Sequence, residues 1–160
     1  MHSKHRNAIR KGEKEGLKFY KILDRRQIND YVLLLEETNK RSAFKPPSAS
    51  HYIDIYDELL ANGLCDWYFI KDQQKRPISG AIVTKIGGHA VYLYGASLRN
   101  IPQGAGNLLH WEIIRDLKAQ GLISYDLGGV NLHAPQGSKP YLIHRFKKRF
   151  GGKLHRYYTL

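Results

Sequence analysis

The sequence predicts an α/β (α+β) protein built on a mixed, mostly antiparallel sheet, with one splayed parallel pair of strands and helices on both faces. Three observations predict this fold. Apolar residues repeat at helical spacing in some segments and alternate, or run together, in several short ones. Gly87-Gly88 joins two strand-like segments as a tight hairpin. A helical segment at residues 103–121 then separates two strands, and such a crossover makes them parallel.

The first part of the chain is predicted to contain a helix, a strand and two further helices, at residues 3–15, 17–23, 25–40 and 48–63. A side-chain oxygen at the start of each helix can cap its free backbone amides: Ser3, Asp24, and Ser48 or Ser50. The first helix is mostly cationic, and Gly16 can end it in a left-handed conformation. Its only apolar residues are Ala8 and Ile9, so it needs a neighbour against which to pack.

Three antiparallel strands follow at residues 66–71, 78–86 and 90–96. Gly80 within the second of them indicates a bulge or a close backbone approach. The next helix opens at Gln103–Gly106, ends near Gly121 and leads into a short buried strand at residues 122–127. A last helix, ended by two glycines, should precede a final strand at residues 153–159. One side of that helix should face the core through Leu142, Ile143, Phe146 and Phe150.

Length and composition indicate one domain. With 160 residues the chain can bury one core but is short for two, so we expect a single domain over residues 1–160, with a basic N-terminal helix at residues 1–16. No run is long enough to span a membrane, and no apolar signal segment follows the basic start. The single cysteine, Cys65, excludes an internal disulfide. We therefore expect a cytoplasmic protein without a transmembrane segment.

Positive charge is the unusual feature of the composition. The net charge is +12, and residues 4–26 hold nine Lys or Arg against three Asp or Glu, while no acidic residue follows Asp126. This excess favours polyanionic partners such as nucleic acid, nucleotide phosphates or an anionic membrane face. The histidines have no metal-ligand spacing, and neither Ser79 nor Ser97 lies in a nucleophile elbow. Metal and hydrolase chemistry therefore find no support.

Lys147 is the first candidate for chemistry. It follows Phe146 at the border of the apolar side of the last predicted helix, inside a cluster of cations without a carboxylate. A lysine held at the edge of a core can serve an anion or a developing negative charge. The alternative is a solvated basic helix face.

The order of elements resembles that of the GNAT acyltransferase fold. In such a fold, a glycine-rich turn that enters a helix beside the splayed strands can bind an anionic cofactor through backbone amides and the helix dipole. Here that turn contains Gly104, Ala105 and Gly106. The match is weak, because the usual pattern has Arg or Gln three residues before the first glycine, where this chain has Ile101. A plain helix-start loop is an equal alternative.

Five segments, in order across nearly the whole chain, carry a more specific resemblance: Arg6–Gly16, Glu37–Arg41, Tyr92–Ser97, Leu109–Glu112 with Gly121 and Tyr125–Gly129, and Phe146–Gly152. Together they resemble the Fem family of aminoacyltransferases, which build peptidoglycan cross-bridges from aminoacyl-tRNA. Fem-type enzymes have two GNAT-like lobes, and this chain resembles only the second. The first lobe supplies part of the acceptor site in the family, so a homodimer or a separate first lobe would have to replace it.

The resemblance implies an aminoacyltransferase that takes its acyl group from aminoacyl-tRNA, without a tightly bound cofactor. Its acceptor would be an amine of a nucleotide-linked or lipid-linked peptidoglycan precursor. Lys147 is similar to the family's lysine that stabilises charge during acyl transfer, where amine attack on an ester creates an oxyanion. Phe146 would support this lysine and flank the tRNA acceptor end, whose bases stack on aromatic rings.

Four further residues resemble the family's substrate contacts. Thr38 and Arg41 are similar to residues that contact the nucleotide-sugar diphosphate of the precursor. Tyr92 and Tyr94, which point to the same side of one predicted strand, are similar to tyrosines that line the substrate channel. The alternatives are that Arg41 is a helix C-terminal cation serving the dipole, and that both tyrosines are core or rim aromatics.

Two other functions fit the same sequence. One is an acyl-CoA N-acyltransferase, although the degenerate glycine turn argues against it. The other is a non-catalytic lobe that binds RNA or a partner protein. Asp126, His133 and His144 can accept protons, but nothing in the sequence identifies any of them as a general base.

Overall fold

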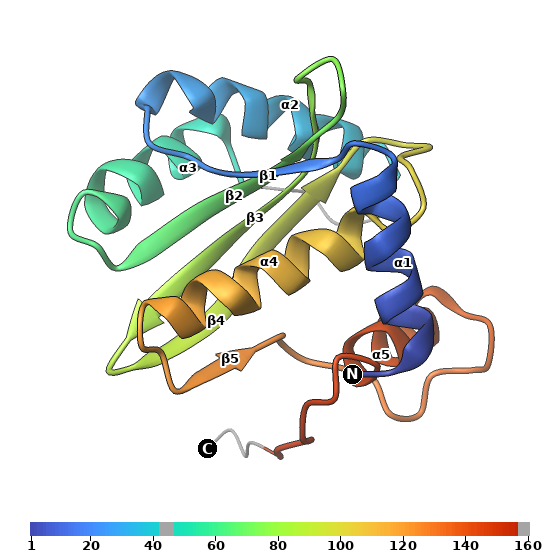
Figure 1. The fold of residues 1–160 in the computed structure, drawn as a ribbon. Helices are drawn as coiled ribbons and strands as arrows, with labels where there is room; N and C mark the ends of the chain where they lie inside the picture. Colours follow the sequence, from blue (N-terminus) through green and yellow to red (C-terminus); the bar gives the residue numbers. More distant parts are fainter. Residues whose placement is uncertain (42–46, 157–160) are drawn as a thin grey trace.

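A five-stranded sheet forms the centre of the computed structural model, which describes residues 1–41 and 47–156 (Figure 1). Its strands lie in chain order: β1 (Lys18–Lys21), β2 (Cys65–Lys71), β3 (Pro77–Ile86), β4 (His89–Ser97) and β5 (Ser124–Asp126). Neighbours from β1 to β4 are antiparallel, whereas β4 and β5 are parallel. The parallel pairing ends at Val91↔Asp126, so the rest of β4 has no partner on that side within the described sheet.

Helices cover both faces of the sheet: α1 (Ser3–Lys14), α2 (Ile28–Asn39), α3 (Ala49–Ile55), α4 (Ala105–Ala119) and α5 (Lys139–Lys148). A 3₁₀ turn, η1 (Arg25–Gln27), precedes α2, and a π-helical turn, η2 (Tyr56–Leu60), continues α3. The helices α2 and α3 lie on one face, whereas α4, crossed by α1, lies on the other (Figure 1). This arrangement confirms the predicted mixed sheet with its crossover helix.

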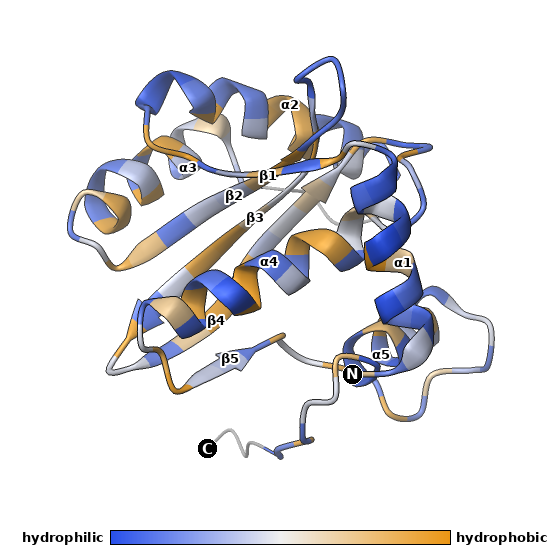
Figure 2. Cartoon of the chain, in the orientation of Figure 1, coloured by the Kyte–Doolittle hydropathy of each residue, from blue (hydrophilic) through white to orange (hydrophobic). Residues whose placement is uncertain are grey.

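Each face of the sheet has its own apolar core, because strand residues alternate between the two sides. The core under α4 includes Ile9 of α1 and Ile113 of α4. The core under α2 and α3 is built around Tyr31, Trp67 and Phe69, which are fully buried. Figure 2 shows a largely hydrophobic β3 at the centre of the sheet and a largely hydrophilic α1 on the outside. Each face of the sheet is therefore covered by its own core, and β4 lacks a partner strand beyond the end of the short strand β5.

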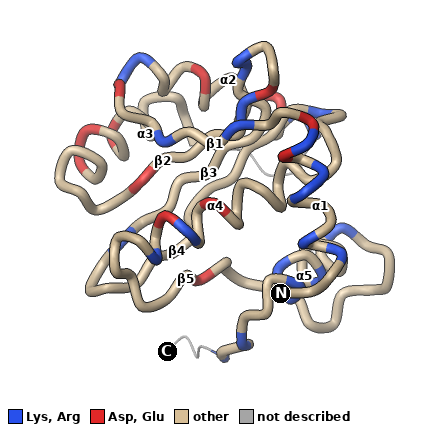
Figure 3. Tube along the Cα trace, viewed as in Figure 1, with Lys and Arg blue, Asp and Glu red and all other residues tan. Residues whose placement is uncertain are grey.

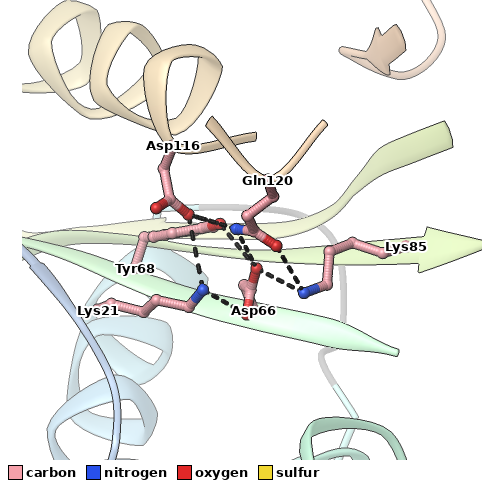
Figure 4. A network of polar contacts seen from close by, with 6 residues as sticks. All are labelled: Lys21, Asp66, Tyr68, Lys85, Asp116 and Gln120. Carbon is pink, nitrogen blue, oxygen red and sulfur yellow. Dashed lines mark hydrogen bonds and ion pairs between the residues drawn. The ribbon is translucent and has the colours of Figure 1, made fainter. Parts of the chain in front are cut away.

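Six polar side chains form a network between the sheet and α4 (Figure 4): Lys21, Asp66, Tyr68, Lys85, Asp116 and Gln120. Its centre is Asp66, which is only 3% exposed. The Asp66 carboxylate lies 2.9 Å from the ammonium of Lys21 and 2.8 Å from that of Lys85. Buried charge is paired with opposite charge here, as folding energetics requires.

A bulge in β4 decides where its tyrosines point. Tyr94 is opposite Ile82 and Tyr92 is opposite Val83, so Leu93 is an extra residue without a partner. Because one inserted residue reverses the alternation, Tyr92 packs into the α4 core and Tyr94 into the α2–α3 core. The prediction that both point to the same side is therefore wrong.

Gly80 marks a close approach and not the bulge. A Cβ atom at Gly80 would lie 2.9 Å from the Phe69 ring, so only glycine lets that ring cross the strand. At the start of α1, the predicted Ser3 cap is also wrong: the imidazole Nδ1 of His2 accepts the Lys4 amide at 3.1 Å.

The C-terminal part departs most from the sequence prediction. On α5, Leu142 and Ile143 are 44% and 40% exposed, so this half of the predicted apolar side does not face a core. The other two predicted residues do pack inward, because the rings of Phe146 and Phe150 contact those of His5 and His110. The strand β5 is partly exposed rather than buried, since it lies at the sheet edge. Residues 153–156 form no strand, and the rest of that predicted strand lies outside the described residues, as does Pro46. None of the described helices is long and apolar enough to cross a membrane.

Candidate active site

Lys147 lies where the parallel pair of strands opens. The helix α5 starts at Ser138, whose hydroxyl accepts the Tyr141 amide, and it carries Lys147 in its last turn. The Lys147 ammonium donates a 2.9 Å hydrogen bond to the carbonyl oxygen of Gly129, just beyond β5. A Cβ atom at Gly128 would lie 3.6 Å from this ammonium and 3.8 Å from the carbonyl oxygen of Tyr92 on β4. The lysine therefore bridges from α5 to the point where β4 and β5 part.

The charge on Lys147 is poorly compensated. Burial lowers the pKa of Lys147, and the more distant Asp126 carboxylate opposes this shift. Among the described residues, no carboxylate lies within ion-pair distance of its ammonium, and Gly129 is its only hydrogen-bond acceptor. Because an ammonium has three N–H donors, two remain for an incoming oxygen. Asp126 itself accepts the Gly128 amide at 2.7 Å, which shapes the turn that holds Lys147.

His110 of α4 forms the centre of an aromatic cluster beneath this lysine. It is 6% exposed, and its Nδ1 lies 3.1 Å from the Tyr125 hydroxyl. Its ring centre is 4.8 Å from that of Tyr92 and 5.6 Å from that of Phe146. Burial lowers the pKa of His110 to about 3, and the positive charges of Lys147 and His5 add to the effect. At neutral pH this histidine is therefore uncharged and acts as packing.

Two of the predicted residues join Lys147 at this site. The Phe146 ring packs between His5 and His110, and its backbone carbonyl lies 2.9 Å from the His5 Nε2. Burial raises the pKa of Tyr92 to about 12, so its hydroxyl stays protonated. A Cβ atom at Gly95 would collide with this hydroxyl, at 1.6 Å, so Gly95 makes room for the tyrosine. The sequence indicated Tyr92 and Phe146, but it gave no signal for the role of Gly95.

Three other predicted residues lie on the opposite face of the sheet, at the far end of β4. Tyr94 lies 3.2 Å from the His51 Nε2 through its hydroxyl. The Thr38 hydroxyl accepts the Ser97 amide at 2.8 Å, and Arg41 donates to the carbonyl oxygens of Ser97 and Leu98. Arg41 thus ties the end of α2 to the end of β4, and most of its donors are occupied.

The glycine turn at the start of α4 is covered. Gly104 has a φ of 103°, and a Cβ atom there would lie 2.1 Å from the Ala8 carbonyl oxygen of α1. Ala105 is fully buried. A Cβ atom at Gly106 would lie 4.0 Å from the Phe146 ring. Because α1 crosses this helix start, the amides of the turn are less accessible to a pyrophosphate than the sequence suggests.

The arrangement can stabilise an oxyanion beside an open strand edge. It combines a half-buried cation, the stretch of β4 beyond its pairing with β5, and a packed aromatic floor, and preorganised donors of this kind stabilise the charge that develops in acyl transfer. Within residues 1–41 and 47–156, no group of three or more His, Cys, Asp or Glu is placed to hold a metal ion. Sequence reasoning missed His110; the only signal was a histidine within an otherwise apolar helix face.

Comparison with known proteins agrees with this geometry. The family model described as an acetyltransferase (GNAT) domain matches residues 1–156. No curated protein matches the sequence. The match confirms the predicted GNAT fold, which rested on the order of the elements.

Solved structures give the same fold. FemX superimposes with a TM-score of 0.81 at 19% identity, over 94% of this chain and 54% of FemX. The C-terminal domain of a putative lysylphosphatidylglycerol synthetase from Agrobacterium fabrum gives 0.68 at 15% identity, over 94% of this chain and 51% of that one. An aminoglycoside acetyltransferase from an uncultured soil sample, in complex with sisomicin, gives 0.63 at 17% identity, over 93% and 99%. This chain spans about half the length of FemX.

Proposed function

This chain belongs to the acetyltransferase (GNAT) domain family, and on that premise we propose that it moves an aminoacyl group from aminoacyl-tRNA to an amine of a peptidoglycan precursor. The general chemistry, acyl transfer, follows from the family and from the acyltransferases among its structural neighbours. The donor and the acceptor are the proposal. The likeness to FemX supports them, together with the sequence segments that resemble the Fem family.

One observation carries the proposal: the Lys147 ammonium is held beside the opening between β4 and β5 with two N–H donors unused. In the reaction, the acceptor amine attacks the ester carbonyl carbon and forms the C–N bond, and the carbonyl electron pair moves to oxygen. Lys147 stabilises that oxyanion. When it collapses, the C–O bond to the ribose breaks, and the proton lost by the amine ends on the ribose oxygen. A single well-placed donor of this kind contributes on the order of 3 kcal/mol to catalysis.

The remaining candidate residues are proposed as supports and substrate contacts. Phe146 and Tyr92 would pack the floor on the Lys147 side. Tyr94, Thr38 and Arg41 lie on the opposite face of the sheet and would line the acceptor side, with the Arg41 guanidinium contacting a phosphate. This chain spans about half of FemX, and we propose that a first lobe or a second copy of the chain completes the acceptor site. Aminoacyl-tRNA as donor would place the reaction in the cytoplasm.

A second function, acyl-CoA N-acyltransfer, is favoured by one comparison. The aminoglycoside acetyltransferase is covered over 99% of its length, so a lobe of this size can be a whole enzyme. Gly104–Gly106 would then hold the pyrophosphate of coenzyme A. The Ala8 carbonyl oxygen against Gly104 opposes that role, because it places a hydrogen-bond acceptor where an anion should bind.

The deciding experiment supplies both donors. The protein is incubated with charged tRNA and a nucleotide-linked muropeptide, or with acetyl-CoA and the same acceptor, and the products are weighed by mass spectrometry. We expect a mass increase of one aminoacyl residue with charged tRNA only. An acetylated product, or no product when a partner lobe is also supplied, would contradict the proposal.

A further inference from the structure

The helices α1 and α5 face each other across a groove of about 470 Å³, with the start of α4 as its floor. Both helices line it with residues at the spacing of one helical face. They are residues 4, 5, 7, 8 and 11 on α1, and residues 142, 145 and 146 on α5 with residue 149 at its C-terminal cap. Gln103, in the turn before α4, and Asn107 of α4 complete the lining. The groove is thus formed by three elements that are far apart in the sequence.

The groove is strongly cationic. Lys4, Lys11, Arg145 and Arg149 line it, and no Asp or Glu does. Among the described residues, Lys4, Arg145 and Arg149 make no ion pair, and Lys11 has only a long contact of 3.9 Å to Glu15. Figure 3 shows Lys and Arg along both helices and no acidic residue on α5. Four cations without carboxylates repel one another, so the groove is stabilised by an anion that enters it.

The shape and the polar lining suit a chain of phosphates. Lys4 and Lys11 are about 10 Å apart along α1, which spans on the order of three phosphates of a nucleic acid strand. Asn7, Gln103 and Asn107 add amide groups that can contact sugars and bases. Further cations, Arg6, Arg10 and Lys14, continue along α1 outside the groove. A polymer can use this extended charge, whereas a single small nucleotide cannot.

The groove also reaches the candidate active site. Phe146 lines it, and the next residue on α5 is Lys147. The other side of the Phe146 ring packs on His110, 5.6 Å away between ring centres. A strand that lies in the groove would therefore pass the aromatic floor on which the Lys147 site rests.

We propose that this α1–α5 groove binds the phosphodiester backbone of single-stranded RNA, and so holds the carrier end of the acyl donor. The inference rests on the proposed function for the identity of the donor. It replaces the glycine turn of α4 as the place where the phosphates of the donor bind. The groove, and not the general surface charge, is responsible for the affinity.

The test measures binding of a fluorescently labelled single-stranded RNA, about twelve nucleotides long and ending in CCA, by anisotropy across a salt series. We expect Arg145→Gln/Arg149→Gln to weaken binding about tenfold at low salt and to reduce the salt slope by about 1.4, because two phosphate contacts are lost. Lys4→Gln/Lys11→Gln on the opposite wall should do the same. The matched control is Lys18→Gln/Lys118→Gln, which removes two exposed cations elsewhere and should change the affinity less than twofold.

Three outcomes would overturn the inference: equal weakening by all three double variants, no weakening by either groove variant, or displacement of the RNA by coenzyme A. Circular dichroism checks that each variant is folded. Lys147→Ala separates the two proposals, because it should bind RNA as the wild type does and lose transfer. If Lys147→Ala retained transfer while the groove variants weakened RNA binding as expected, the proposed function alone would be contradicted. If Lys147→Ala lost transfer but the groove variants bound RNA as tightly as the wild type, the groove proposal alone would be contradicted.

Discussion

The positive charge of lysines that lie partly inside this molecule is compensated differently in two places. Beside β2, the ammonium groups of Lys21 and Lys85 meet the buried Asp66 carboxylate, and Asp116 and the Tyr68 hydroxyl extend the network. At the end of β5, Lys147 meets one backbone carbonyl oxygen. The first group is locally neutral, whereas the second carries charge that only a more distant Asp126 offsets.

The difference distinguishes a lysine that holds the fold together from one that is available to a substrate. Burial alone would raise the pKa of Asp66, but the hydrogen bonds from Lys21, Lys85 and Gln120 outweigh it, and its pKa is lowered. That carboxylate is therefore ionised and fully engaged. Lys147 has a lowered pKa for the opposite reason, because burial is stronger than its compensation. Its unmet charge is what an oxyanion would satisfy.

Removing the carboxylate at the centre of the first group should have the largest effect. Asp66→Ala removes the buried carboxylate that Lys21 and Lys85 share and leaves Asp116 as the remaining carboxylate of the network, so we expect a loss of about 4 kcal/mol in the free energy of unfolding. Urea denaturation measures it. Asp54→Ala, at an exposed helix position, is the control and should cost about 0.5 kcal/mol or less. If the two variants had equal stability, the network would not be structural.

Removing Lys147 should affect activity and spare stability. We expect Lys147→Ala to reduce the transfer rate about 100-fold, which corresponds to about 3 kcal/mol of transition-state stabilisation. Lys147→Met keeps most of the side-chain stem and should lose as much, because the charge is what matters. Rates are measured with saturating donor and acceptor, and melting temperatures with the same samples. If the Lys147 variants lost stability and kept their transfer rate, Lys147 would be a structural lysine, as Lys21 and Lys85 are.

Acid should destabilise the fold because protonated His110 would add a second positive charge beside Lys147. His110 is neutral in the fold with a pKa of about 3, against 6.5 for an ordinary histidine, so the unfolded chain binds the proton first as pH falls below 6.5. Stability is therefore lost on acidification between those values, by about 2 kcal/mol at pH 4.5 after allowance for relaxation around the ring.

Denaturation curves at pH 7 and pH 4.5 test this expectation. His110→Asn keeps an acceptor for Tyr125 and should remove the His110 part of the loss, whereas His133→Gln in an exposed loop should leave it unchanged. Protonation of Asp66 in acid also destabilises the protein, because the pKa of Asp66 is lowered in the folded state. This contribution is common to all three proteins. His5 and Lys147 are the other charges that face this ring. Equal losses in wild type and His110→Asn would mean that His110 titrates normally.

Much of the fold was predictable because the signals were local. The hairpin at Gly87-Gly88, the Asp24 cap and the helix after Gly104 each depend on residues a few positions apart. The β4 bulge was not predictable, since Leu93 is extruded by the register of β3 and leaves no pattern in its own strand. It moved Tyr94 away from Tyr92 and so divided the predicted substrate residues between two faces of the sheet.

The site was predictable only where chemistry was visible in the residue type. Lys147 and Phe146 stand out in a basic segment without acids, and the structure brings them to one place with Tyr92. The cover over Gly104 depends on Ala8, nearly a hundred residues earlier, and Phe146 of α5 is packed by the rings of His5 and His110 whereas Leu142 of the same helix stays exposed. Contacts of that kind are set by tertiary packing, which the periodicity of a single helix does not encode.

Replacing Arg41 should have the smallest effect of these variants. Arg41 can belong to either class of cation, those that stabilise the fold, as Lys21 and Lys85 do, or those that are available to a substrate, as Lys147 is. Its guanidinium donates to the carbonyl oxygens of Glu37, Ser97 and Leu98, as a structural cation does. We expect Arg41→Ala to cost about 1 kcal/mol in stability, since these carbonyl oxygens lose a charged donor. If the arginine also holds phosphate, KM for the acceptor should rise about fivefold with kcat unchanged, because uniform binding is lost. Lys40→Ala, the exposed neighbour, is the control for both measurements. A change in stability with an unchanged KM would mean that Arg41 serves the fold alone, and that an uncompensated charge, as on Lys147, is needed before a cation in this molecule serves a substrate.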